Sequence, residues 1–482
     1  MDKKYFVLLA AMSVVPAGCS MGPEYARPEA PIPTTFPSGP AYKEATAEAG
    51  APAAMEVPWQ EFFTDERLQK VIAIALENNR DLRSAALNVE RASALYGVQR
   101  SELLPKVYAT ANAAKHRVPG DLSATGKRTT LEQYDVNLGT VAWELDFFGR
   151  IRSLEKQALE EYLATEQAQR SAQVLLVSGV ANAYLTLAAD RQSLKLAKTT
   201  LETQQGAYDL VKRRFERGVA PELDVFRAQT QVDTARGDVA RFTQLVAQDE
   251  NALNLLVAAT VPADLLPTDL EQIRPPKEIS AGTSSEVLLY RPDILQAENR
   301  LRAANANIGA ARAAFFPRIT LTGAVGTASS DLDGLFKSGS GTWSFGPQVA
   351  LPIFDPQIWS AAKVSEADKK IAIAQYEKAI QTGFREVADA LAVNGTVNEQ
   401  VAAQESLVRA VSETYRLSNS LYTKGLQDYL SVLDAQRSLY AAQQQLVSLQ
   451  LAKVANQVTL YAVLGGGWQN PGDVSEGQAA AK

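Results

Sequence analysis

The 482-residue sequence is poor in several residue types on which catalytic and metal sites depend. Its one cysteine, Cys19, excludes an internal disulfide and a cysteine-based zinc cluster. Its one histidine, His116, excludes a histidine-rich metal site and a histidine relay. Aromatic residues make up only 7%, and 48 basic against 54 acidic side chains give a formal net charge of -6. We therefore expect no metal, no cofactor and no nucleic-acid partner.

Proline is absent from long stretches of the chain. Nine of the 22 prolines lie before residue 60, and none lies between Pro119 and Pro221 or between Pro356 and Pro471. Because proline breaks helix interiors, these gaps permit helices far longer than the usual 11–12 residues or so. A conventional enzyme of about three domains becomes less probable than a long-helix protein.

The N-terminus has the features of a secretory signal. Lys3 and Lys4 precede an apolar run over residues 5–15, and small residues then lead to Cys19. A cysteine directly after the cleavage site resembles a bacterial lipoprotein signal, in which the thiol takes up lipid. Pro16 departs from the usual pattern, and an ordinary secretory signal with an unpaired cysteine is the alternative. No later apolar run reaches the roughly 18 residues of a membrane helix, so a membrane would be crossed by strands.

An internal duplication organises the rest of the chain. Residues 214–229 return 207 residues later as residues 421–436, with aromatic, basic, glycine and aliphatic positions in register. Heptad steps continue downstream in both copies. The seam positions are Val225, Ala228, Val232, Ala235, Val239, Phe242, Val246, Asp249, Leu253 and Leu256, and then Val432, Ala435, Leu439, Ala442, Leu446, Leu449, Lys453, Asn456, Leu460 and Val463.

The upstream parts correspond as well, since Pro105 matches Pro317 and Phe147 matches Phe354. Each half reads as helix, proline, strand, loop, strand, long helix, glycine turn and helix. The long helices are expected over residues 150–214 and 358–421, each about 95–100 Å at about 1.5 Å per residue. They end at Gly218 and Gly425, because glycine adopts the left-handed conformation that terminates helices.

Four segments alternate apolar and polar residues over roughly the 9–11 positions that a membrane strand needs. They follow Pro105 and Pro317 in pairs, with polar loops between the members of each pair. Pro347 and Pro352 make the fourth segment the weakest. Four strands cannot close a barrel and an open edge is forbidden in lipid, so several chains would share one barrel. Two soluble hairpins packed on a core are the alternative.

Several segments resemble TolC-type outer membrane factors, and in particular the OprM-like lipoprotein branch. They are the signal with Cys19 and residues 22–28, 143–150, 291–294, 313–317 and 433–437. The resemblance implies a mainly α fold with a transmembrane β portion. Three chains would form a twelve-stranded outer-membrane barrel with four strands each, continued by a long periplasmic α-helical barrel. Ser20 after the cysteine favours sorting to the outer membrane.

The resemblance also implies a function and its partners. Such proteins are homotrimeric exit ducts for antibiotics, solvents and other toxic amphiphiles. They join a periplasmic membrane-fusion adaptor to an inner-membrane transporter of the resistance-nodulation-division type, and they contact outer membrane lipid. By resemblance, a periplasmic gate lies at Tyr422, Leu430, Asp434 and Arg437, with Asp224 and Arg227 as candidate partners. The adaptor would meet Gly218, Val219, Ala220, Gly425, Leu426 and Gln427.

The spacing of the proposed gate residues is consistent with this, because Leu430, Asp434 and Arg437 share a helix face. For any single charge, a solvated face is the alternative. Rival functions are a duct for protein secretion and a periplasmic coiled-coil adaptor. An enzyme is disfavoured, because Glu144, Asp146 and the lone His116 form no convergent acid–base set.

The expected organisation assigns the chain to consecutive segments. They are the signal peptide 1–18, a lipidated leader 19–65, a helix 66–104, a hairpin 105–147, a helix pair 148–257, an equatorial linker 258–290, a helix 291–316, a hairpin 317–354, a helix pair 355–464 and a tail 465–482.

Overall fold

The computed structural model describes residues 21–42, 54–124, 126–279, 282 and 284–468. The expected signal peptide, Cys19 and most of the expected tail lie outside these residues. The chain divides into two compact units, each built from separated segments rather than from consecutive domains. The first holds Asn88–Thr165, Gln296–Tyr376 and the described residues up to Glu29. The second holds the described parts of Ala30–Leu87 and Glu166–Leu295, and the chain from Glu377 to residue 468.

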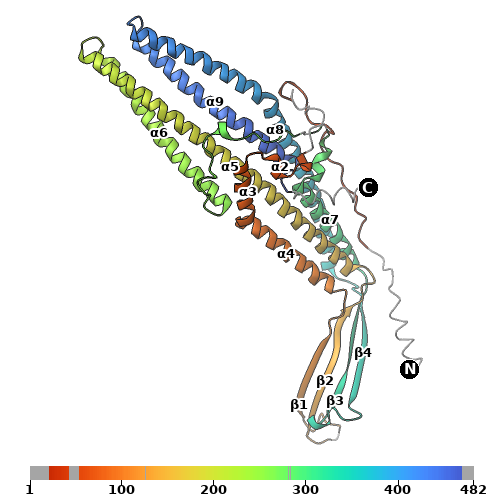
Figure 1. The fold of residues 1–482 in the computed structure, drawn as a ribbon. Coiled ribbons are helices and arrows are strands. Elements are labelled where there is room, and N and C mark those ends of the chain that lie inside the picture. Colours follow the sequence, from red (N-terminus) through yellow and green to blue (C-terminus); the bar gives the residue numbers. More distant parts are fainter. Residues whose placement is uncertain (1–20, 43–53, 125, 280–281, 283, 469–482) are drawn as a thin grey trace. The chain divides into compact units, whose positions relative to one another are not determined.

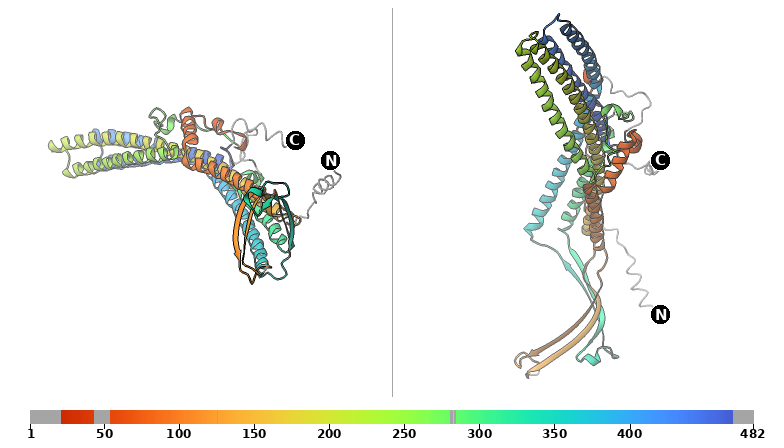
Figure 2. Two further views of the ribbon diagram at one scale, coloured as in Figure 1. Left: turned by 90° about the horizontal axis from the view of Figure 1, so that it is seen from below. Right: turned by 60° about the vertical axis from the view of Figure 1, so that its left-hand side comes forward.

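The first unit contains a single antiparallel sheet of four strands in sequence order (Figure 1). Its strands curve along their length (Figure 2). The fourth strand forms in spite of Pro347, which pairs with Leu321 of β3 in the antiparallel register. The strands are β1 (Tyr108–Val118), β2 (Thr129–Glu144), β3 (Arg318–Ser329) and β4 (Gly341–Ala350), and a 3₁₀ turn, η5 (Leu332–Gly334), lies between β3 and β4.

The two inner strands lie close together at a pair of glycines. A Cβ on Gly139 of β2 would lie 2.3 Å from the carbonyl oxygen of Gly323 on β3. A β-bulge follows between Thr140 and Trp143, where Ala142 adopts a positive φ of 51°. The extra residue bends β2 just before the chain leaves the sheet.

The helices repeat with a fixed offset, as the sequence predicts. Adding 207 to the bounds of α5 (Arg150–Glu216) and α6 (Glu222–Val257) gives 357–423 and 429–464, which lie within one residue of α8 (Pro356–Thr423) and α9 (Tyr429–Val463). The earlier helices α4 (Arg80–Ser101) and α7 (Pro292–Ala313) are offset by 212. The stretch between α7 and α8, which holds the second pair of strands, is therefore shorter than that between α4 and α5, chiefly because β4 is shorter than β2.

The helix expected over residues 66–104 is two helices. The first, α3 (Glu66–Asn78), ends at Asn79, and α4 begins immediately after it. The Asn79 side chain accepts a hydrogen bond from the Leu82 amide at 2.9 Å and donates one to the Leu256 carbonyl at 2.8 Å. One asparagine therefore caps the second helix and ties the break to the end of α6.

The heptad seam lies in the packed interface, since all twenty of its positions are buried or half-buried.

The hydropathy of α5 departs from expectation. One 18-residue window of α5 reaches a mean hydropathy of 1.5, enough by composition for a membrane helix. Of that window, 56% is buried inside the chain, which is typical of a core helix. The buried side chains of α5 concentrate between Val174 and Ala189.

The linker after α6 crosses the helices of the second unit. Leu270 packs with Ala188, Ala189 and Val447, so it joins α5 to α9. Arg291 has a side chain only 9% exposed, and its guanidinium binds Asp293, Glu386 on α8 and the Val463 carbonyl. The short elements of this unit are η1 (Pro40–Tyr42), η2 (Ala54–Glu56), α2 (Trp59–Phe62), η3 (Leu270–Gln272) and η4 (Ser285–Tyr290).

In the first unit, the leader is held against α7 by a buried carboxylate. Glu298 is 2% exposed and accepts hydrogen bonds from Arg27 at 2.9 and 2.5 Å, from the Tyr25 hydroxyl at 3.1 Å and from Arg302 at 2.7 Å. These bonds hold the pKa of Glu298 below its usual range, although burial alone would raise it. A Cβ on Gly309 would lie 2.9 Å from the Cα of Gly22, so only glycine admits the leader there.

Candidate functional site: the two helical turns

The turns that join α5 to α6 and α8 to α9 have the same backbone geometry. Gly218 and Gly425 adopt positive φ values of 72° and 75°. In the first turn, Gly218 N–H donates to the Phe215 carbonyl at 2.8 Å and Val219 N–H to Arg214 at 2.8 Å. The corresponding bonds of the second turn are both 2.9 Å. Each turn therefore closes with paired hydrogen bonds of the Schellman type around a left-handed glycine.

The return helices begin differently. Pro221 precedes α6 and makes no side-chain cap, which agrees with the expected proline start. Asp428 precedes α9 and accepts bonds from the amide of Ser431 at 3.1 Å and from its hydroxyl at 2.7 Å. These two bonds hold the pKa of the exposed Asp428 carboxyl below its ordinary value.

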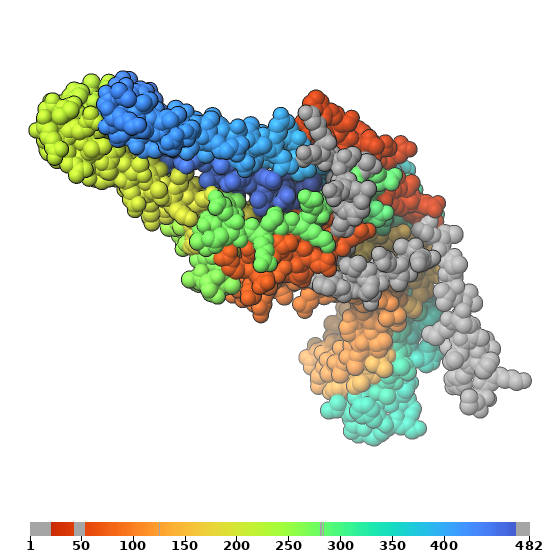
Figure 3. All heavy atoms as spheres, turned by 45° about the horizontal axis from the view of Figure 1, so that its top comes forward, coloured from red at the N-terminus to blue at the C-terminus, as the bar shows by residue number. Residues whose placement is uncertain are grey.

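An apolar cluster joins the two hairpins just behind the turns, where their ends lie side by side in Figures 1 and 3. Tyr422 is 6% exposed, and its ring lies 5.2 Å from that of Tyr429, which is 2% exposed. The buried members of this tip cluster are Val211, Ala228, Tyr422, Tyr429, Val432 and Leu433.

The tip cluster buries polar groups that lack hydrogen-bond partners among the described residues. The hydroxyls of Tyr422 and Tyr429 are both buried and unpaired. Burial raises the pKa of both phenols, so both stay neutral. Arg214 lies over the Tyr422 ring at 4.6 Å, and it donates to the Tyr422 carbonyl at 3.4 Å.

The structure separates the predicted gate residues into two environments. Tyr422 lies inside the tip cluster, whereas Leu430 on α9 is 41% exposed and Asp434, one turn further along, is also exposed. Within the described chain Asp434 has no ion-pair partner. Arg437 donates to the Gln231 side chain at 3.1 Å, so it links α9 to α6.

The first-copy candidates do not reach these residues within one chain. Asp224 pairs with Arg227 at 3.4 Å along α6 itself. Among the described residues, neither of them forms an ion pair with Asp434 or Arg437. Leu430 and Asp434 therefore lie on an exposed face of α9 in the single chain.

The residues predicted to meet an adaptor are accessible. Val219 is 64% exposed and Leu426 is 72% exposed. Gly218 and Gly425 are exposed, and Ala220 and Gln427 are half-buried. The first turn is flanked by further exposed apolar side chains, Phe215 at 40%, Leu223 at 56% and Phe226 at 63%.

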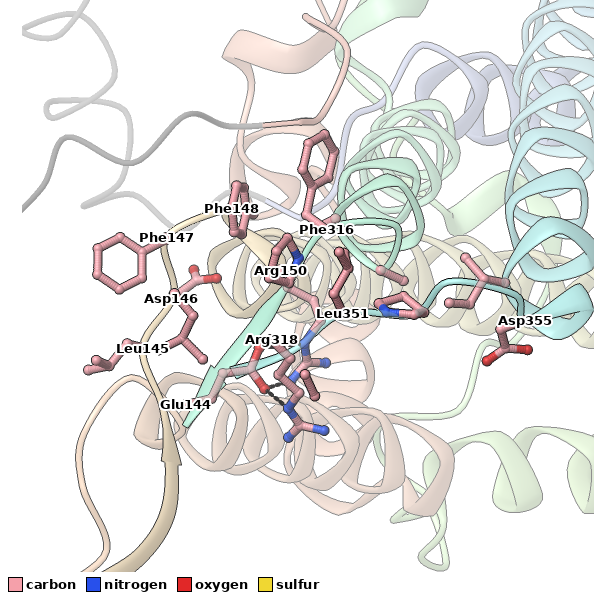
Figure 4. A pocket seen from close by; sticks show the side chains of 17 residues that line it. Glu144, Leu145, Asp146, Phe147, Phe148, Arg150, Phe316, Arg318, Leu351 and Asp355 are labelled. Atoms are coloured by element: carbon pink, nitrogen blue, oxygen red, sulfur yellow. Dashed lines mark hydrogen bonds and ion pairs between the residues drawn. The ribbon is translucent and has the colours of Figure 1, made fainter. Parts of the chain in front are cut away.

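Glu144 and Asp146, the acidic pair considered for catalysis, line a cavity of about 480 Å³ at the ends of the strands (Figure 4). Both have structural roles. Arg150 binds Glu144 through two bonds of 2.8 and 2.9 Å, and Arg318 binds it at 2.5 Å. Asp146 accepts bonds from the first amides of α5 at 3.1 and 2.9 Å. Glu144 is therefore neutralised and Asp146 is a helix cap, whereas His116 lies exposed on β1.

Sequence reasoning missed three residues of the site: Arg214, Tyr429 and Gln231. Tyr429 lies three residues before the seam residue Val432 on α9, so i, i+3 spacing was a usable signal. Arg214 has Leu421 as its counterpart in the repeat, and the mismatch hid its cation–π role. Gln231 has no sequence signature, because its contact with Arg437 depends on how two helices pack.

Comparisons with known proteins agree with this architecture over nearly the whole chain. A family model described as outer membrane efflux protein matches residues 71–259 and 283–466. The toluene efflux pump outer membrane protein TtgF of Pseudomonas putida is 48% identical over 97% of this chain and 98% of its own length. The probable efflux pump outer membrane protein TtgC of the same species is 46% identical over 99% of each chain.

A solved structure gives the same result for the fold. The outer membrane channel MtrE of Neisseria gonorrhoeae, solved in its open state, has a TM-score of 0.84 at 38% identity, and the match covers 94% of this chain and 99% of that one.

Proposed function

Because the chain belongs to the outer membrane efflux protein family, we propose that it is the exit duct of a tripartite pump of the resistance-nodulation-division type. It is an outer membrane channel and not an enzyme, and its sheet supplies four strands of a trimeric twelve-stranded barrel. The observation that carries the proposal is the duplicated hairpin with matched glycine turns, joined to a four-stranded sheet on one chain.

The names of its relatives support a cargo for the duct, and its partners are proposed from the family resemblance. The names of TtgF and TtgC refer to a toluene efflux pump and to an efflux pump, so we assign solvents, antibiotics and other toxic amphiphiles to this chain. The partners are a periplasmic membrane-fusion adaptor and an inner-membrane transporter. Expression in a host that lacks its efflux channel, together with a cognate adaptor and transporter, should restore toluene and antibiotic tolerance. Restored protein secretion without restored tolerance would favour the secretion duct instead.

The two turns are the proposed contacts of the adaptor. Support comes from the exposed apolar side chains that surround rigid, identically closed backbones, since Val219 and Leu426 project from the two turns. Replacing Leu426 by Asp should abolish co-purification of the adaptor but leave the trimer intact. Replacing Leu332, which is 67% exposed in the loop between β3 and β4, by Asp is the matched control and should retain the adaptor.

The gate is proposed on the exposed face of α9. Three-fold symmetry turns Leu430 into an apolar ring and Asp434 into an acidic one. The unpaired Asp434 supports this assignment, and so do the buried, unpaired tyrosine hydroxyls behind it, because a core with unsatisfied groups is easier to rearrange. Replacing Asp434 and Arg437 by Ala should raise single-channel conductance in planar bilayers. The matched control removes Asp233 and Arg236, an exposed pair on α6 at 3.1 Å. Equal conductance of both variants would refute the gate.

A lipid on Cys19 is the proposed anchor of the N-terminus. It is supported by the signal-like sequence and by the tight docking of the leader a few residues later, at Tyr25 and Arg27. Metabolic labelling with a radioactive fatty acid should mark the protein and should fail to mark the Cys19→Ala variant. A labelled variant would place the lipid elsewhere.

A further inference from the structure

Two carboxyl groups face each other between the helices of the first hairpin. Asp190 lies on α5 and Asp249 lies on α6, eight residues before that helix ends. The side chains are within hydrogen-bonding reach of each other. The Oδ2 atom of Asp249 is nevertheless fully buried, and among the described residues no group donates a hydrogen bond to it while both carboxyl groups are ionised. Two carboxylates offer only acceptors, so a hydrogen bond between them requires a proton on one of the two.

The surrounding charges do not neutralise the pair. Arg191 is adjacent to Asp190, but its guanidinium binds Glu250 at 2.6 Å and the Pro267 carbonyl at 2.5 Å. Asp269 in the linker forms an ion pair with Lys195 at 3.8 Å. Asp65, which precedes α3, forms one with Arg67 at 3.9 Å. On α9 the charged seam residue is Lys453, one turn before Asn456. Among the described residues, Asp190 is the charge that acts on Asp249.

The second repeat holds a different pair at the same two places. Adding 207 to 190 and 249 gives Val397, which is 3% exposed, and Asn456, which is 8% exposed. The Asn456 amide donates to the Ala390 carbonyl on α8 at 3.0 Å. An amide donates at every pH, whereas a carboxyl donates only when it is protonated. The two hairpins therefore share a backbone but differ at this seam position in their response to protons.

We propose that Asp190 and Asp249 share one proton across α5 and α6, and that they form a pH-sensitive joint at the root of the first hairpin. With the proton present, one carboxyl donates to the other and the two helices are held together. When water removes the proton, two like charges face each other in a partly buried interface and the joint loosens. The hairpin α8–α9 has no equivalent response.

The direction of the effect follows from the titration of Asp249. Burial, together with the hydrogen bond and charge of Asp190, raises the pKa of Asp249 from 3.8 to about 6. A folded-state pKa above the unfolded value means that the stabilisation is complete in acid and is lost as the pH rises through about 6. Protection of the local amides should fall by up to about tenfold between about pH 5 and pH 7.5.

Hydrogen exchange on the intact detergent-solubilised trimer tests the proposal, with rates corrected for intrinsic exchange. Amides of residues 246–257 should lose protection between about pH 5 and pH 7.5. Those of residues 453–463, which contain Asn456, should not, and they serve as an internal control. The double variant Asp190→Val with Asp249→Asn copies the second repeat, so its packing has a precedent. It should abolish the pH response, and Asp233→Asn should preserve it.

Infrared difference spectra add a second measurement. A protonated-carboxyl band should disappear with a midpoint near pH 6 and be absent from Asp249→Asn. The reciprocal change Asn456→Asp should introduce pH-dependent protection into residues 453–463. A pH response that survives in the double variant, or a carboxyl band that survives in Asp249→Asn, would overturn the shared proton. A wild-type protein with no response at residues 246–257 would do the same.

Discussion

The turn at Gly425 offers a quantitative test of how the hairpins are closed. Its φ of 75° lies in the left-handed region, and a Cβ built there has no atom within 4 Å. Substitution by Ala therefore meets no steric contact, and its cost is that of the backbone alone, about 1–2 kcal/mol. Two hydrogen bonds of 2.9 Å close the turn, so this cost appears as easier opening of those bonds. One to two kcal/mol corresponds to roughly a 5- to 30-fold loss of protection.

Hydrogen exchange of the peptide that spans residues 420–430 measures this loss. Gly425→Asn should lose less protection than Gly425→Ala, because asparagine tolerates the left-handed region. Gly237→Ala is the matched control, since Gly237 lies in the interior of α6 with nothing within 4 Å of its Cβ position. That change should stabilise its helix by up to about 1 kcal/mol. Equal protection in wild type and Gly425→Ala would refute the reasoning, and so would identical behaviour of the Ala and Asn variants.

Three further changes have opposite or absent effects in matched controls. Gly309→Ala should release the leader and expose residues 21–42 to protease, because the new Cβ would meet the leader backbone and cost about 1–3 kcal/mol of stability. The repeat counterpart Gly97→Ala should have no such effect, because the space around Gly97 is open. In thermal unfolding, Tyr429→Phe should be neutral or stabilising because it removes an unpaired buried hydroxyl, whereas Tyr461→Phe, which loses a 2.7 Å bond, should cost about 1 kcal/mol. In wild type, protection of the leader should fall as the pH drops below about 4.5, because a carboxyl group with a lowered pKa gives stability that acid removes. Glu298→Gln should weaken this pH dependence, and an unchanged acid profile would contradict the prediction.

Much of the architecture could be predicted because the duplication tests each prediction twice. The offset of 207 joins Gly218 to Gly425, and both glycines terminate long helices as expected. The strands were visible as alternating segments, and β4 forms although Pro347 removes one hydrogen-bond donor from it. The break at Asn79 was missed because its cause is partly remote: the side chain caps α4 and also reaches the end of α6.

The candidate site was only partly readable. The exposure of Leu430 and Asp434 follows from the helix periodicity of α9, which the sequence of one chain shows. The burial of Tyr422 and its pairing with Arg214 depend on how two hairpins pack, and no local pattern specifies that. The pairing of Asp224 with Arg227, in contrast, is an i, i+3 contact along one helix and could have been predicted from spacing. The heptad pattern predicts which face of a helix is buried, but it does not predict which polar atoms form hydrogen bonds with one another.

The two helical turns share one backbone shape but present different side chains. Their backbones close with hydrogen bonds that agree within 0.1 Å, yet the side chains that they present differ, with Val219 and Ala220 in one and Leu426 and Gln427 in the other. Since main-chain hydrogen bonds around a glycine close each turn, replacing the exposed Val219 or Leu426 by another residue with a free amide should cost little stability. If the two turns are the proposed adaptor contacts, one turn can change its side chains and its partner while the other keeps the original ones.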